Sequence, residues 1–152
     1  MFAFRIAKQP YARDLSGKGA ELQGGRWNSE GTRMLYAATS RSLALVESLV
    51  HLPGGLRPEG AFELITLRLE GEEGPRIELS NLVELFRDGE PRQEMQRLGD
   101  EFIREASFLY GRAPSVIVPE EDNILVNPLH PRAQDIRVMH ARQIRFDVRL
   151  FR

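Results

Sequence analysis

A carboxylate lies in the middle of the most apolar helical stretch of the chain. Leucine and valine recur at helical spacing on two neighbouring stripes of the segment 40–52, and Glu47 stands among them. Burying a lone carboxylate is costly unless it is paired or protonated. We therefore expect Glu47 to line a cavity or to meet a cation. From the helix alone, a structural ion pair or a place at the rim of the apolar face is the slightly favoured explanation.

A second unusual string is Gly24-Gly25-Arg26-Trp27, in which two glycines precede an arginine and the only tryptophan. Glycine lets the backbone approach a ligand closely, and the planar guanidinium fork suits phosphate or carboxylate. Arg26 and Trp27 are therefore candidate binding residues. Read alone, the same string also fits a turn with a surface arginine and a core tryptophan.

Three further polar side chains occur in or beside apolar strands. Tyr36 lies in the segment 34–38, where the small Ala37 and Ala38 leave room for its ring to stack on a planar ligand. Ser115 begins one predicted strand and Asn127 ends the next, so both could hold a substrate. Each of the three could instead serve only packing or nearby backbone groups.

Composition excludes several classes of function. Lys and Arg number 21 against 22 Asp and Glu, which predicts no direct binding of nucleic acid. No cysteine is present, so disulfides, thiolate metal sites and cysteine nucleophiles are excluded. The 3 histidines show no metal-ligand pairing, and we predict no metal. Apolar runs are too short for a membrane helix, and the start lacks the pattern of a signal peptide, so we expect a cytoplasmic protein.

The elements that must position these residues follow from periodicity and turn signals. Thr39 or Ser40 is the predicted N-cap of a central, buried helix that ends at Pro53-Gly54-Gly55. The order predicts one α+β domain over 1–152, with mixed or antiparallel sheets and inserted helices. The other predictions are strands at 2–7, 34–38, 62–70, 114–119, 123–128 and 144–150, helices at 82–86 and 91–109, a loop at 14–25 and a turn at 71–75.

The order of these motifs resembles the RES domain, over nearly the whole chain. By this resemblance Arg26 matches the family's arginine, Glu47 its glutamate and Ser115 its serine, while Tyr36 matches a tyrosine often found in the site. Phe102 departs from the family, which often has tryptophan there. The strings that carry the resemblance are 15–20 (LSGKGA), 24–28 (GGRWN), Gly31-Thr32, Leu35-Tyr36, 43–52 (LALVESLVHL), 114–119 (PSVIVP), Asn123, Asn127-Pro128 and His130-Pro131.

The resemblance implies a fold similar to that of ADP-ribosyltransferase toxins. It also implies a bacterial toxin that arrests growth by consuming NAD+, its substrate, with no prosthetic group and with an Xre-type antitoxin blocking the site. Glu47 would stabilise the ribose cation, Arg26 the pyrophosphate and Tyr36 the nicotinamide, with Trp27, Ser115 and Asn127 as further substrate-binding residues. The sequence leaves open hydrolysis, phosphorolysis, transfer of ADP-ribose to a protein, or a domain that only binds a nucleotide or a partner.

Overall fold

The structure of the chain, a computed structural model, describes residues 1–51, 60–78 and 92–151. The described strands have helices inserted between them at irregular intervals rather than in regular alternation, which is typical of an α+β domain. The strands are β1 (Phe2–Lys8), β2 (Leu35–Ala38), β3 (Phe62–Arg68), β4 (Tyr110–Pro114), β5 (Asp122–Val126) and β6 (Arg137–Ile144), and the helices are α1 (Gln9–Ala12), α2 (Lys18–Gln23), α3 (Arg41–Val50) and α5 (Arg92–Glu105).

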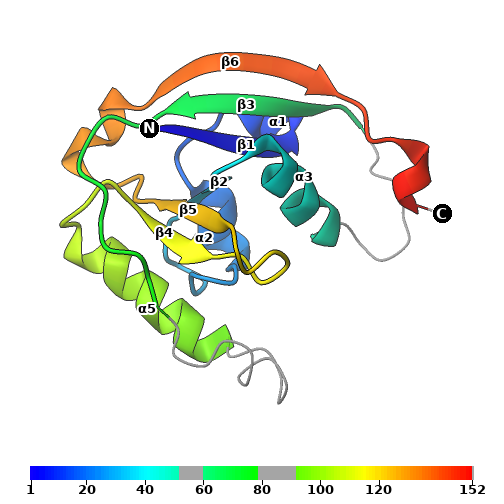
Figure 1. Cartoon of the computed structure of the whole chain (residues 1–152). Coiled ribbons are helices and arrows are strands. Elements are labelled where there is room, and N and C mark those ends of the chain that lie inside the picture. The colour runs from blue at the N-terminus through cyan, green and yellow to red at the C-terminus, as the bar shows by residue number, and fades with distance from the viewer. Residues whose placement is uncertain (52–59, 79–91, 152) are drawn as a thin grey trace.

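The six strands form one antiparallel sheet in the order β4-β5-β2-β1-β3-β6, which confirms the predicted fold class. The sheet nearly divides in its middle. β1 pairs with β3 along its whole length, but with β2 only where Phe4 faces Ala38. Where β1 and β2 diverge, the Arg5 Nη1 donates a 3.3 Å hydrogen bond to the Tyr36 carbonyl. Figure 1 shows the result as two layers, with β6, β3 and β1 above β2, β5 and β4.

The two halves of the sheet enclose the main hydrophobic core. Alternate residues of the strands face inward there, among them Ile65 and Leu67 of β3 and Ile124 and Val126 of β5. Their neighbours in sequence face outward, toward the helices. On that outer side α3 packs on β1 and on neighbouring residues of β2 and β3, and α5 packs on β4 and β5.

Helix α3 begins as predicted, because the Ser40 Oγ accepts a 3.0 Å hydrogen bond from the Leu43 backbone N–H. The prediction that this helix is central and buried was wrong. Only Leu43 and Ala44 are buried, and Val50 is exposed. The strands supply the main core themselves, so α3 packs on the outer face of the sheet. The predicted end at 52–55 and the helix at 82–86 lie outside the described residues.

Four other predictions were wrong for identifiable reasons. The loop 14–25 contains α2, which has no buried residue and so shows no apolar period. Helix α5 stops at Glu105, and Leu109 packs in the main core instead. The segment 115–118 bends rather than forming a strand, because the Ser115 hydroxyl accepts hydrogen bonds from the backbone N–H groups of Ile117 and Val118.

The predicted last strand at 144–150 is also displaced. The strand β6 is already complete at Ile144, and a 3₁₀ turn follows at Val148–Phe151. Phe146 packs edge-to-face on Phe62, with ring centroids 5.1 Å apart, and also contacts Phe151. The alternation of apolar residues therefore serves an aromatic cluster rather than strand pairing.

Gly99 in α5 provides a test of how this helix packs. A methyl group at Gly99 would overlap the Trp27 carbonyl oxygen. Alanine normally stabilises a helix by about 1 kcal/mol relative to glycine. We predict that Gly99→Ala instead lowers the free energy of unfolding by at least about 2 kcal/mol, as measured by urea denaturation.

The matched control is Gly19→Ala in α2, where a methyl group meets no atom within 4 Å. We expect a small gain in stability there. A Gly99→Ala variant as stable as this control would show that α5 does not pack against the Trp27 backbone.

Candidate active site

The two oxygens of the Glu47 carboxylate have different surroundings. Oε1 accepts hydrogen bonds from the Ser115 Oγ at 2.8 Å and from the Asn123 Nδ2 at 2.6 Å. Oε2 lies 3.7 Å from the Arg26 Nη1, an ion pair longer than a direct hydrogen bond. The side chains of Arg26 and Glu47 are 15% and 14% exposed. The carboxylate is thus largely withdrawn from water but still accessible to a small molecule.

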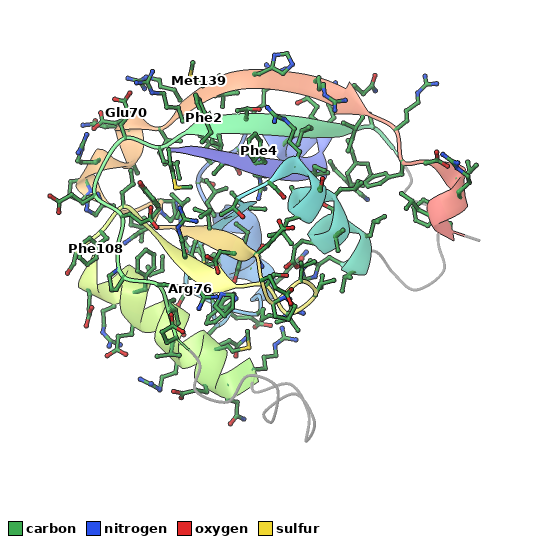
Figure 2. The ribbon with its side chains drawn as sticks, viewed as in Figure 1. Phe2, Phe4, Glu70, Arg76, Phe108 and Met139 are labelled. Atoms are coloured by element: carbon green, nitrogen blue, oxygen red, sulfur yellow. The ribbon has the colours of Figure 1, made fainter. Side chains whose placement is uncertain are left out.

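The start of α3 is fastened to the turn between β4 and β5. The Ser40 hydroxyl, besides capping α3, donates a 2.8 Å hydrogen bond to the Glu121 Oε2. The Thr39 backbone N–H and hydroxyl both donate to the Asp122 carbonyl, at 3.1 and 2.9 Å. Arg76, labelled in Figure 2, donates from Nε to the Asp122 Oδ1 at 2.9 Å. The bonds from Thr39 and Ser40 fix the helix that carries Glu47 relative to the turn between its two donors, Ser115 and Asn123.

Ser115 supports Glu47. Its oxygen accepts the backbone N–H groups of Ile117 and Val118, each at 3.1 Å, so its single proton is available for the Glu47 carboxylate. The side chain is buried. The structure therefore places Ser115 beside Glu47, where it supports the carboxylate. Binding of a substrate by Ser115 stays a prediction.

Asn123 was not among the residues predicted for the site. In the register of the sheet it lies between Ala38 of β2 and Ala113 of β4, and the methyl side chains on either side leave its amide room to reach Glu47. The segment Asp122–Val126 shows no alternation that would mark an outward-facing residue. A hairpin centred on Val118 would have been the usable signal, because it pairs residue 113 with residue 123.

Arg26 is carried by a loop that Tyr36 holds in place. The Tyr36 hydroxyl donates to the Asn28 Oδ1 at 2.6 Å and accepts from the Trp27 backbone N–H at 3.0 Å. Gly25 is required here, because a methyl group on it would come within 2.6 Å of the Tyr36 hydroxyl oxygen. Burial raises the pKa of Tyr36 well above its ordinary value. Stacking of its ring on a ligand stays a prediction.

Asn28 and α5 complete the support of this loop. The Asn28 side chain is fully buried, and its amide group donates hydrogen bonds within the loop and to α2. From α5, the Gln96 Nε2 donates to the Gly25 and Asn28 carbonyls at 2.9 and 3.1 Å. The position of Arg26 therefore depends on β2, α2 and α5. The carbonyls that accept from Asn28 are those of Ala20, Ser29 and Thr32.

Two predicted substrate-binding residues lie elsewhere. The Trp27 side chain is 1% exposed and packs in the core with Met34 and Leu125. Asn127 is fully buried past the far end of β5, about 13 Å along the chain from Asn123 at 3.3 Å per residue. Its amide donates to the Ile103 carbonyl and its Oδ1 accepts the Leu129 N–H. Both positions contradict direct contact with a substrate at Glu47, because core packing and backbone bonds already occupy these side chains.

Within residues 1–51, 60–78 and 92–151, no group of three or more His, Cys, Asp or Glu side chains could hold a metal ion. No helix described there is both long enough and apolar enough to cross a membrane.

The arrangement of Arg26, Glu47 and Ser115 agrees with the resemblance seen in the sequence. Residues 2–149 match the RES domain family. The chain belongs to the RES domain family. Among relatives of this RES domain, the "Prs ADP-ribosylating toxin" of Sphingobium sp. (strain YBL2) is 38% identical over 93% of this chain and 89% of its own length. A "Toxin Res" of Pseudomonas putida is 38% identical over 91% and 92%.

A solved structure extends the likeness to the fold. The M. tuberculosis MbcT–MbcA toxin–antitoxin complex contains a chain that matches this RES domain with a TM-score of 0.70 and 18% identity, over 94% of this chain and 83% of that one. At this identity the match establishes that the two chains share a fold. Within that fold, Glu47, Ser115 and Asn123 are brought together from three separate segments of this RES domain.

The buried Tyr36 hydroxyl gives a pH-dependent test. We predict that Tyr36→Phe lowers the free energy of unfolding by about 1–3 kcal/mol at neutral pH, because the Trp27 N–H and the Asn28 Oδ1 lose their partner. The ordinary tyrosine pKa is 10.0, and burial raises that of Tyr36 in the folded state. Above that pH the unfolded chain loses this proton before the folded chain does. The stability advantage of the wild type over the variant should therefore shrink as the pH rises above 10.0.

The measurement is urea denaturation of both proteins at several pH values, where titration of the other groups cancels in the difference. Tyr11→Phe is the control, because Tyr11 is exposed. A stability difference that stays constant up to high pH would contradict the burial of the Tyr36 hydroxyl.

Proposed function

We propose that this RES domain is a toxin that consumes NAD+ by cleaving the bond between nicotinamide and ribose. The observation that carries the proposal is the Glu47 carboxylate, which two donors hold on one oxygen while the other oxygen faces Arg26. Breaking this bond develops positive charge on the ribose. A fixed negative group that is largely withdrawn from water stabilises such charge strongly.

The other residues of the site have matching parts in this proposal. Arg26, at the end of the glycine pair, binds the pyrophosphate through its guanidinium fork. The Tyr36 ring borders the nicotinamide, while its hydroxyl holds the Arg26 loop. Glu47 stabilises the ribose cation and accepts a proton from the incoming group.

Two fates of the ADP-ribose group have separate support. Hydrolysis or phosphorolysis needs only water or phosphate at the site, and we propose it as the principal reaction. Transfer to a cellular protein is the second candidate, favoured by the relative named as an ADP-ribosylating toxin. Either reaction begins with the same bond cleavage, so Glu47 has the same part in both.

The proposal extends to a partner protein. A toxin that depletes cytoplasmic NAD+ arrests growth of the cell that makes it, so it must be held inactive. We propose an antitoxin of the Xre type that covers the site around Glu47. Support comes from the shared fold with a chain of a toxin–antitoxin complex. Coexpression of a helix-turn-helix protein encoded beside this chain should restore growth, and growth arrest that persists would contradict this part of the proposal.

Replacement of Glu47 tests the reaction itself. We predict that Glu47→Gln lowers kcat for NAD+ consumption at least about 100-fold, because glutamine keeps the shape but not the negative charge. The matched control is Glu63→Gln on β3, which neutralises another buried carboxylate, one that is paired with Arg13. Near-wild-type turnover in Glu47→Gln would sink the mechanism.

The products decide between the fates of ADP-ribose. The purified protein, free of any partner, is incubated with labelled NAD+ in the presence and absence of phosphate. Free ADP-ribose indicates hydrolysis, ADP-ribose-1″-phosphate indicates phosphorolysis, and label on an added protein extract indicates transfer. A folded wild-type protein that leaves NAD+ intact in every mixture overturns the proposed function.

A further inference from the structure

The two Glu47 oxygens differ in their capacity to accept a further hydrogen bond. A carboxylate oxygen has two lone pairs, and on Oε1 both are directed to donors, the Ser115 hydroxyl and the Asn123 amide. Oε2 has the Arg26 guanidinium as an ion-pair partner at 3.7 Å, which is longer than a hydrogen bond. Among residues 1–51, 60–78 and 92–151, no donor lies at hydrogen-bond distance from Oε2, and its lone pairs can accept from a group that enters the site.

We infer that Asn123 is a positioning residue, which fixes Oε1 together with Ser115 so that Oε2 is the oxygen that acts on the substrate. This inference rests on the proposed function. In the reaction, the electron pair of the broken bond leaves with nicotinamide while the incoming oxygen bonds to the ribose carbon. Oε2 takes the proton that this oxygen loses.

The fold itself does not require the Asn123 amide. The backbone of Asn123 is already paired with Ala38 on one side and Ala113 on the other. Asparagine is also unfavourable in strands, where a β-branched residue packs better. The hydrogen bond that the structure gives to its amide nitrogen goes to Glu47. The presence of an asparagine in this strand is thus explained by the carboxylate above it.

The position of the donors also explains why two are needed. One hydrogen bond leaves a carboxylate free to rotate about its last side-chain bond, which would exchange Oε1 and Oε2. Ser115 directly follows β4 and Asn123 is the second residue of β5, so the two donors approach the same oxygen from neighbouring strands. A carboxylate held from two directions keeps one oxygen toward the substrate without reorganisation during the reaction.

The test compares two substitutions of Asn123. Asn123→Ala removes the donor, and Asn123→Asp keeps the shape but replaces the donor with a second carboxylate against Glu47. We expect kcat for NAD+ consumption to fall about 10- to 100-fold in the alanine variant and further in the aspartate variant. KM for NAD+ should stay within about twofold, because Arg26 and its loop are unchanged.

Ser48→Ala is the matched control on the same helix. The Ser48 hydroxyl bonds the Ala44 carbonyl of its own helix at 2.6 Å, so its loss should leave kcat unchanged. Ser115→Thr, which keeps the hydroxyl, should retain more activity than Ser115→Ala. Circular dichroism and thermal unfolding establish which variants are folded, and the isosteric aspartate variant serves if the alanine variant is not.

The outcomes separate the two proposals. A wild type that leaves NAD+ intact overturns the proposed function and, with it, this inference. An active wild type with folded Asn123 variants at wild-type kcat overturns the inference alone. A raised KM at unchanged kcat assigns Asn123 to substrate binding and also overturns its positioning role.

Discussion

The carboxylate of Glu47 is largely withdrawn from water, and the rest of the site depends on how its lost hydration is replaced. Such a group is tolerated only where hydrogen-bond donors and opposite charge replace water. Here the replacements come from three segments far apart in sequence, the Arg26 loop, the bend after β4 and the start of β5. The burial of Glu47 on α3 therefore requires both the strand register and the loop geometry that bring these groups to it.

The division of the sheet into two halves allows α3 to bring Glu47 to these groups. Because β1 and β2 pair at a single point, the two halves of the sheet fold over a shared core and leave their outer faces to α3 and α5. Helix α3 packs through Leu43 and Ala44 where the two halves meet, on a cluster with Phe4, Ala38 and Leu64, and its start is hydrogen-bonded to Glu121 beside β5. Glu47, farther along α3, can then reach donors that belong to β4 and β5.

Features that depend on residues close together in the chain could be predicted from the sequence, and features that depend on distant residues could not. The N-cap at Ser40 and the strand around Tyr36 depend on neighbours in the chain, and both predictions were confirmed. The bend at Ser115 is also local. The valines and isoleucine that follow predict a strand, but the Ser115 hydroxyl accepts two of their backbone N–H groups and bends the chain. Asn123 was missed because its role depends on a strand register that composition does not reveal. Trp27 was assigned to the site because it follows Arg26. In a tight loop, however, adjacent side chains can point in opposite directions, and the Trp27 side chain points into the core.

The contacts of Glu47 differ in length between its two oxygens, and this difference matters for the proposed reaction. On the side away from the ion pair, Ser115 and Asn123 hold Oε1 by short hydrogen bonds, and the Arg26 loop is itself held by Tyr36, Asn28 and α5. The contact between the Arg26 and Glu47 side chains is the longer one. In the proposed reaction, a pyrophosphate has to take up the guanidinium and a ribose has to meet Oε2, so this contact is the one that must yield. Glu47 and the Arg26 loop are each held by other hydrogen bonds, so the substrate can replace the long Arg26–Glu47 contact without breaking those bonds. The charges that face the transition state are therefore already in place.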